Sequence, residues 1–330
     1  MKWQGRKVLV TGADGFIGSH LTEALIDAGA DVRAFCFYNS NGSLGWLDRS
    51  RLPVRELAEV RLGDIRDARF VEASCEDVEI VFHLAALIAI PYSYAAPESF
   101  IDTNVRGTLN VLEAVRRHSC KRLVITSTSE VYGTPDSLPI TEDHPLKAQS
   151  PYSATKIAAD KLAEAYYNSF VLPVVTLRPF NTYGPRQSAR AVIPNILSQL
   201  LAGREEIELG NTTPKRDLTF VRDCVKGFLA AGITDGIEGR TIQLGTGRAD
   251  SIADVFRAAC TACGVSARIR QSSERMRPEK SEVMVLQSDP SLAKKLLGWQ
   301  SEVGLEEGLS LTADWMRENM ASFTPTEYAI

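Results

Sequence analysis

Tyr152 and Lys156 are the two residues whose types and spacing best suit acid–base chemistry in this chain. If residues 151–170 form a helix, the two side chains lie one turn apart on the same face. A phenol titrates near ~10, and a neighbouring ammonium group and the positive ring of an oxidised nicotinamide both favour its ionised form. We therefore expect Tyr152 to take a proton from a hydroxyl group whose carbon gives up a hydride. The spacing alone is weak evidence, because an exposed Tyr and Lys on a solvated helix have the same pattern.

A glycine-rich turn near the N-terminus predicts a dinucleotide site. The run Lys7–Thr11 is β-branched, and the apolar periodicity of a helix follows the turn. Strand, turn and helix in this order let the backbone approach a pyrophosphate, which the free amides and positive dipole at the helix N-terminus attract. The spacing is G-x-x-G-x-x-G, not the commoner G-x-G-x-x-G, and a purely structural turn is the alternative. The residues expected to bind the cofactor here are Gly12, Gly15, Phe16, Ile17 and Gly18.

The second strand, predicted over Asp31–Phe37, does not indicate whether the cofactor is NAD or NADP. An acidic residue at its end would bind the ribose of NAD, and an Arg nearby would accept the 2′-phosphate of NADP. The expected position holds Cys36, so neither signature is present. We expect NAD and leave NADP open. Residues 38–53 are predicted to be a loop near the adenosine.

Two further strand ends are predicted to meet the cofactor. Asp64 and Ile65 follow a strand predicted over Leu57–Leu62, and the carboxylate would accept from the adenine amine. A fourth strand, Val78–Leu84, runs into small residues that let a cofactor lie close to the backbone. The residues expected there are Leu84, Ala85 and Ala86.

The alternation of strands and helices predicts an α/β protein. A Rossmann-type, doubly wound parallel sheet is expected over residues 1–180, with segments returning to it from the C-terminal half. A long helix over about Glu98–His118 precedes a strand, Arg122–Thr126, that delivers Thr128 and Glu130 to the carboxyl edge of the sheet. From about residue 181 the alternation loosens. Residues 181–330 are therefore predicted to be mainly a smaller, interwoven substrate lobe.

Composition argues against several other classes of protein. The formal net charge of −4 over 330 residues gives no attraction to nucleic acid or to an anionic membrane. No apolar run reaches membrane-spanning length and no signal-peptide core follows Met1, so a cytoplasmic protein is expected. The six cysteines are scattered, and Cys260 and Cys263 lack a second Cys or His pair, so no metal site is expected.

A set of motifs along the chain resembles the extended short-chain dehydrogenase/reductase family. The matching residues are Gly12-x-x-Gly15-x-x-Gly18, Asp64, His83–Ala86, Asn104, Thr128, Tyr152-x-x-x-Lys156 and Arg178-Pro179-x-Asn181-x-x-Gly184-Pro185. The resemblance runs from residue 7 to about residue 318. It implies a Rossmann domain with a substrate lobe, NAD or NADP as cofactor, and a nucleotide-diphosphate sugar as substrate.

The same resemblance implies a role for each matching residue. Tyr152 would be the base, and Lys156 would hold the nicotinamide ribose and lower the pKa of Tyr152. Thr128 would hydrogen-bond the sugar oxygen that is oxidised. Contacts to the nucleotide diphosphate are expected from Asn181, Arg216 and Arg277, and Arg suits phosphate well.

The triplet Thr128-Ser129-Glu130 resembles that of GDP-mannose 4,6-dehydratases. Similar 4-epimerases have a small or neutral residue in place of Glu130, and dTDP-glucose 4,6-dehydratases have Asp in place of Ser129. In a dehydratase, Glu130 would remove a C5 proton, and Ser129 or Glu130 would assist departure of the C6 hydroxyl. UDP-glucuronate decarboxylases share the triplet but have an arginine where this chain has Ser288. Dehydratase is therefore favoured over epimerase and decarboxylase.

Other segments bear on substrate and assembly. Residues 37–40, 90–94 and 187–194 resemble the UDP- or GDP-N-acetylglucosamine 4,6-dehydratases of legionaminic acid-type pathways, which implies a UDP- or GDP-linked N-acetylhexosamine. Similar enzymes pair helices like 98–118 and 151–170 across a two-fold axis, so a homodimer is expected. A non-catalytic dinucleotide sensor on the same fold is the competing class, and it is disfavoured because Thr128, Tyr152 and Lys156 are all present.

Overall fold

A seven-stranded parallel sheet organises the chain, with strand order β11-β6-β5-β4-β1-β2-β3. The computed structural model describes residues 2–272, 275 and 281–323. Every strand pair of the sheet is parallel, which confirms the predicted Rossmann-like α/β fold. The strands are β1 (Lys7–Thr11), β2 (Asp31–Phe37), β3 (Ala58–Gly63), β4 (Ile80–His83), β5 (Arg122–Thr126), β6 (Val174–Pro179) and β11 (Thr241–Leu244).

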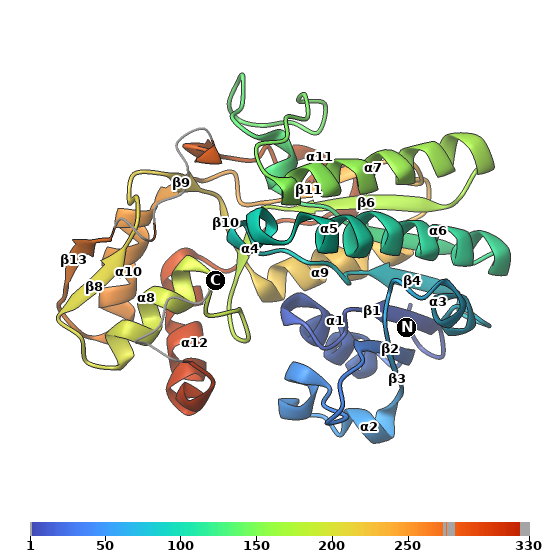
Figure 1. The fold of residues 1–330 in the computed structure, drawn as a ribbon, viewed down its shortest axis with the longest axis horizontal. Coiled ribbons are helices and arrows are strands. Elements are labelled where there is room, and N and C mark those ends of the chain that lie inside the picture. The colour runs from blue at the N-terminus through green and yellow to red at the C-terminus, as the bar shows by residue number, and fades with distance from the viewer. Residues whose placement is uncertain (1, 273–274, 276–280, 324–330) are drawn as a thin grey trace.

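Helices cover both faces of this sheet (Figure 1). On one face α3 packs on α6 and α6 on α7, and on the other α1 packs on α9. Because the central strands are buried on both sides, their sequences are continuous apolar runs; every residue of β6 is buried. The helices are α1 (Phe16–Asp27), α3 (Ala68–Ser74), α6 (Gly107–His118), α7 (Pro151–Phe170) and α9 (Val221–Ile233).

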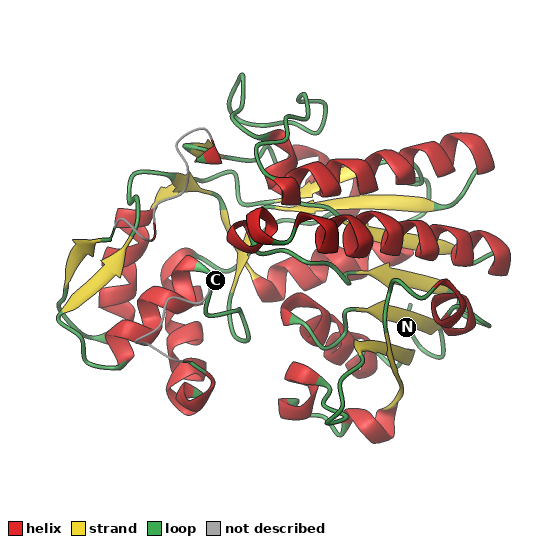
Figure 2. Cartoon of the chain, viewed as in Figure 1, coloured by secondary structure: helices red, strands yellow, loops and turns green. Residues whose placement is uncertain are grey.

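The C-terminal half builds a smaller lobe beside the carboxyl ends of the strands (Figures 1 and 2). Its core is a set of three mutually packed helices. These are α8 (Val192–Leu201), α10 (Ile252–Cys263) and α12 (Leu305–Glu318). The strands β8 (Glu206–Leu209) and β13 (Arg268–Gln271) pair on its outer side. The predicted return of the C-terminal half to the first domain is also present, because β11 pairs with β6.

Very short strands join the two parts of the molecule. They are β7 (Asn181–Tyr183) with β10 (Leu218–Phe220), and the trio β9 (Lys215–Arg216), β12 (Asp250–Ser251) and β14 (Val285–Leu286). Two- and three-residue strands have no periodicity, so the sequence did not predict them. The remaining helical segments are α2 (Val54–Leu57), α4 (Ile90–Ala95), α5 (Pro97–Phe100), α11 (Ser291–Leu297), and the 3-10 turns Gly45–Arg49, Ser129–Tyr132 and Met320–Ser322.

The long helix predicted over about 98–118 is interrupted. A π-helical segment, Ile101–Arg106, separates α5 from α6. Within it, the Asn104 side chain accepts a hydrogen bond from the Leu87 amide (2.8 Å) and donates to the Leu87 carbonyl (2.9 Å). The wider turn thus anchors the loop after β4, a typical use of a π-bulge. The predicted loop 38–53 likewise contains a 3-10 turn, Gly45–Arg49.

Among the described residues, no helix is both long and apolar enough to span a membrane.

Candidate active site

The helix α7 begins where its sequence provides caps. Ser150 and Ser153 form a capping box, and Pro151 occupies the first turn, where its missing N–H costs nothing. The helix therefore starts one residue before Tyr152. Both Tyr152 and Lys156 are buried, with 7% and 5% of their surfaces exposed. The alternative interpretation, that Tyr152 and Lys156 are an exposed pair on a solvated helix, is therefore wrong.

Lys156 ties α7 to the end of β5. Its Nζ donates to the Thr126 carbonyl at 2.5 Å. Thr128 follows two residues later and hydrogen-bonds the Tyr152 side chain. The carboxyl edge of the sheet therefore brings together the three residues that the sequence placed in one reaction.

The pKa of Tyr152 moves in the opposite direction to the one expected. Burial raises it, the hydrogen bond with Thr128 lowers it, and the negative charges of Glu130 and Asp160 raise it. Burial also lowers the pKa of Lys156, which only Asp160 opposes. Desolvation of the phenolate dominates here, and Lys156 is not among the groups that shift the pKa of Tyr152.

Glu130 is close enough for its charge to act on the phenol. It belongs to the 3-10 turn Ser129–Tyr132, which Thr128 caps by accepting a hydrogen bond from the Glu130 amide at 3.2 Å. The Glu130 charge acts on Tyr152, so the two side chains share one electrostatic environment. Ser129 is buried, whereas Glu130 is partly exposed.

The glycine turn packs so closely on the protein's own backbone that no side chain would fit at Gly12 or Gly18. Gly12 has φ +69°, and a Cβ there would lie 2.8 Å from the Ala85 nitrogen. At Gly18 a Cβ would lie 2.0 Å from the Gly12 carbonyl oxygen. Gly15 caps α1 without a side-chain hydrogen bond, so the first amides of the helix, including those of Phe16 and Ile17, have no intrahelical partner. These features fit a dinucleotide pyrophosphate.

The segment after β4 lies against this turn. The amides of Leu84 and Ala85 donate to Thr11 Oγ1, each at 3.2 Å. His83 is fully enclosed between Thr11 Oγ1 (2.8 Å from Nδ1) and Thr108 Oγ1 (3.1 Å from Nε2). Burial lowers the pKa of His83 to about 3, so it stays neutral and structural. Ala86 follows in the same loop, and its expected contact with the cofactor stays a prediction.

Asp64, which was expected to bind the adenine, already has a partner within the protein. The Asp64 carboxylate accepts from Arg66 Nη2 at 2.5 Å and Nε at 3.0 Å, so a ligand amine would compete with a guanidinium. Ile65 is buried and packs on Gly107. At the end of β2, burial raises the pKa of the Cys36 thiol to about 12, so that position carries no charge. Asp14 Oδ2 accepts from the Phe37 amide at 3.2 Å, a contact that the sequence did not indicate.

The three residues expected to contact the phosphates differ in their surroundings. Among the described residues, Asn181 Oδ1 is buried and has no hydrogen-bond partner, which leaves it able to accept a hydrogen bond from a ligand. Arg216 is 7% exposed, and its Nη2 lies 3.0 Å from Glu282 Oε1. Arg277 lies outside the described residues. Among the residues that are described, no cluster of three or more metal-ligating side chains occurs.

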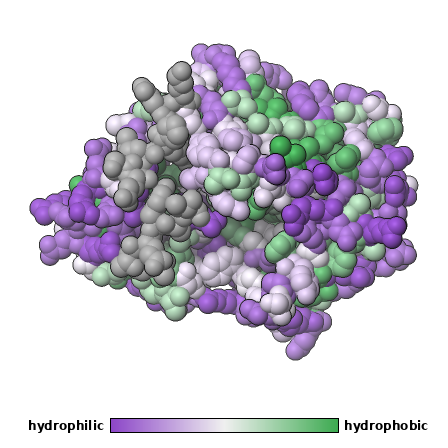
Figure 3. Space-filling model, in the orientation of Figure 1, coloured by the Kyte–Doolittle hydropathy of each residue, from purple (hydrophilic) through white to green (hydrophobic). Residues whose placement is uncertain are grey.

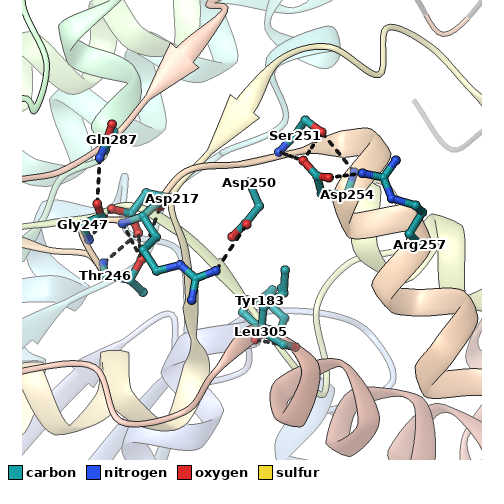
Figure 4. A network of polar contacts seen from close by, with 11 residues as sticks. Tyr183, Asp217, Thr246, Gly247, Asp250, Ser251, Asp254, Arg257, Gln287 and Leu305 are labelled. Atoms are coloured by element: carbon teal, nitrogen blue, oxygen red, sulfur yellow. Dashed lines mark hydrogen bonds and ion pairs between the residues drawn. The ribbon is translucent and has the colours of Figure 1, made fainter.

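Asp217 fixes the strand that carries Arg216. Its carboxylate accepts from the amides of Thr246 (2.7 Å) and Gly247 (2.9 Å), as Figure 4 shows. The same carboxylate accepts from Ser288 Oγ at 2.5 Å. Ser288 is the position where decarboxylases would have an arginine, and here it is a buried neutral hydroxyl held by an acid. That position offers no cation to a substrate carboxylate.

A family profile described as GDP-mannose 4,6 dehydratase matches residues 9–312. The chain belongs to this family. The UDP-glucose 4-epimerase of Mycolicibacterium smegmatis is 34% identical to it over 316 residues, which cover 94% of this chain and 98% of that protein. The dTDP-glucose 4,6-dehydratase of an Actinoplanes species is 32% identical over 324 residues, covering 96% and 100%.

A solved structure leads to the same family. DesIV, a dTDP-glucose 4,6-dehydratase from Streptomyces venezuelae with NAD and TYD bound, superposes with a TM-score of 0.88 at 28% identity, covering 97% of this chain and 100% of that one. The relatives thus include both dehydratases and epimerases. This member of the family is an enzyme of the nucleotide-sugar dehydratase and epimerase type, and its own residues must distinguish the reactions.

Proposed function

We propose that this enzyme is an NAD-dependent nucleotide-sugar 4,6-dehydratase. The observation that carries the proposal is the position of Glu130. Its carboxylate charge acts on Tyr152, and it lies on the 3-10 turn that Thr128 caps. Epimerisation needs only removal and return of a hydride at C4. Dehydration also needs a base for the C5 proton, and Glu130 is that base.

Each residue has one task in this reaction. Thr128 holds the C4 oxygen while Tyr152 takes the 4-hydroxyl proton. NAD held by the turn from Gly12 to Gly18 would supply the hydride acceptor and donor, and its positive charge would favour the Tyr152 phenolate despite burial. The new ketone acidifies C5, Glu130 takes the C5 proton, and the C6 hydroxyl leaves as water with Ser129 or Glu130 assisting. C5 is protonated again as the hydride reaches C6, so that of the two protons taken by Tyr152 and Glu130 one leaves in the water and one returns to C5. The product is a 4-keto-6-deoxy sugar and the cofactor is regenerated.

For the substrate, we propose a UDP- or GDP-linked N-acetylhexosamine. The support is the resemblance of residues 37–40, 90–94 and 187–194 to the dehydratases of legionaminic acid-type pathways. We assign the diphosphate to Asn181, whose Oδ1 is an unpartnered buried atom, and to Arg216 and Arg277. NAD is favoured over NADP because neighbours such as DesIV hold NAD, and because Arg55, the cation that acts on Cys36 at the end of β2, is paired with Asp48.

A 4-epimerase is the second candidate, favoured by the M. smegmatis relative. Purified protein incubated with UDP-, GDP-, dTDP- and CDP-sugars distinguishes the two. A dehydratase yields a product lighter by one water, whereas an epimerase yields an isomer of unchanged mass. An unchanged mass with every sugar that is turned over would contradict the dehydratase proposal.

We also propose that the protein is a homodimer formed through α6 and α7. Apolar residues gather over these helices on the face shown in Figure 3. Large apolar side chains stand exposed on these helices, with Leu109 at 37% and Phe170 at 52%, and Ile101, in the π-helical segment that leads into α6, is 53% exposed. A two-fold axis would bury such a patch against its own copy.

A further inference from the structure

A buried ion pair lies behind the catalytic face of α7. Asp160 is one helical turn after Lys156, and its Oδ2 accepts from Arg178 Nη2 at 2.9 Å and from Nε at 3.2 Å. Both side chains are 5% exposed. Removing two charges from water offsets most of their attraction, so such a pair adds little to stability and its presence calls for another role.

The same carboxylate oxygen holds the end of β5. Ser127 Oγ donates to Asp160 Oδ2 at 2.7 Å. Ser127 directly precedes Thr128, the residue that hydrogen-bonds Tyr152. Asp160 therefore fixes Thr128 through its neighbour and Lys156 through the helix that they share.

Arg178 extends the connection to the Glu130 turn. Its Nη1 donates to the Tyr132 hydroxyl at 2.9 Å, and its guanidinium lies 5.0 Å from the centre of the Tyr132 ring. Gln243 Nε2 donates to the same hydroxyl at 2.8 Å. Tyr132 is completely buried and closes the 3-10 turn that contains Ser129 and Glu130. Four elements, α7, β5, β6 and this turn, thus meet at one ion pair.

Building on the proposed function, we propose that Asp160 is a positioning residue whose ion pair with Arg178 holds Lys156, Thr128 and the Glu130 turn in one geometry. The hydrogen bonds reach every catalytic element, yet neither partner has been assigned a part in the chemistry. Positioning of this kind matters because displacements of about 1 Å can cost roughly 100-fold in rate.

The charge of Asp160 also acts on the catalytic pair. It opposes the burial that lowers the pKa of Lys156, and it adds to the burial that raises the pKa of Tyr152. Other titratable groups also face this region: His83 from β4, Arg178 from β6, and Glu130, Tyr132 and Glu142 from the segment after β5. Lys161 and Glu164 line the neighbouring cavity, which has a volume of about 260 Å³. Loss of the Asp160 charge should therefore lower both pKa values.

Asp160→Asn tests the electrostatic part without any substrate. The protein is labelled with ¹³Cε-lysine, the Lys156 resonance is assigned by its absence in Lys156→Arg, and its titration midpoint is compared between variants. We expect a lower midpoint in Asp160→Asn than in the wild type. Glu164→Gln, the matched loss of an exposed carboxylate one turn further along α7, should leave the midpoint unchanged. Equal midpoints in Asp160→Asn and wild type would overturn the proposal, whatever the substrate proves to be.

Ser127→Ala tests the geometric part and keeps both buried charges, so it carries the test if Asp160→Asn does not fold. We expect kcat to fall about 10-fold with KM nearly unchanged and the pH profile unmoved. Asp160→Asn should instead move both limbs of the pH profile to lower pH, because Tyr152 and Lys156 both lose a neighbouring negative charge. A Ser127→Ala enzyme with wild-type kcat would refute the positioning role.

Discussion

Glu23 and Arg186, 163 residues apart in the sequence, form a buried ion pair with 2.7 Å between Glu23 Oε1 and Arg186 Nη2. Their side chains are 9% and 8% exposed. Glu23 lies on α1, the helix that starts at the cofactor turn, and Arg186 lies in the loop after β7, which carries Asn181. One turn earlier on α1, His20 Nε2 lies 3.0 Å from the Pro185 carbonyl. The cofactor helix and the substrate loop are thus joined directly.

We predict that Glu23→Gln destabilises the protein by about 3–5 kcal/mol, because it leaves Arg186 as an uncompensated buried charge. Urea unfolding measures the change. The double variant Glu23→Gln with Arg186→Met is the control and should recover most of the loss. A single variant as stable as the wild type would show that the pair contributes nothing.

The same pair should make stability depend on pH. Burial acts to raise the pKa of Glu23, but the hydrogen bonds from Arg186 and Ser50 outweigh it, so the net pKa is lowered. A lowered carboxyl pKa stabilises the fold above the ordinary carboxyl range, and this contribution is lost as the pH falls through the folded-state value. Unfolding free energies measured at stepwise lower pH should therefore fall more steeply in wild type than in the double variant. Parallel curves would contradict this prediction.

Cofactor should remain bound through purification. The proposed cycle is redox-neutral and the glycine turn fits a pyrophosphate, so denatured protein should release dinucleotide although none was added. Chromatography of the supernatant identifies it and distinguishes NAD from NADP. Protein that is active only with continuously supplied cofactor would count against a redox-neutral cycle.

Gly18→Ala should abolish this retention, because the new Cβ would lie 2.0 Å from the Gly12 carbonyl oxygen and force the turn open. The released dinucleotide per protein is the measurement. Gly304→Ala is the control, since a Cβ there meets nothing within 4 Å and its φ of −71° is ordinary. Full dinucleotide content in Gly18→Ala would show that the turn is not the cradle.

Glu130→Gln should separate oxidation from elimination. It preserves the size of the side chain but removes the base, so dehydration should fall by ~10² to 10⁴-fold while reduced nicotinamide and a 4-keto hexose still form. Tyr152→Phe should show neither signal. Absorbance of the reduced cofactor and mass spectrometry of the sugar follow the two steps. Equal slowing of both steps in Glu130→Gln would make Glu130 structural and favour the epimerase.

The dimer is tested by charge placed in the apolar patch. Leu109→Glu should give a monomer by light scattering at micromolar concentration, because an unpaired charge would be buried at the interface. Leu138→Glu, at another exposed leucine away from α6 and α7, is the control. A wild-type protein that is monomeric at every concentration would remove the proposal.

The sequence by itself determined the order of the elements and the local machinery. The apolar run of β1 and the glycines after it act through neighbours in the chain, so their spacing predicted the strand and the turn correctly. The helix expected over residues 151–170 is α7, and the capping serines that start it were found in the structure. Helical periodicity placed Tyr152 and Lys156 on the same face of α7, although the spacing alone was weak evidence for a catalytic pair. Family resemblance then extended these local features to expected roles.

Only the tertiary structure decided how these parts act on one another. The direction of the pKa shift of Tyr152 depends on how completely the phenol is desolvated, and burial is a property of the whole fold. The ion pairs Glu23–Arg186 and Asp160–Arg178 join distant segments that carry no shared pattern. The π-helical turn at Asn104 arises because its side chain binds Leu87 from another loop. Contacts between segments far apart in the chain leave no periodic signal, so no reading of local sequence could have supplied them.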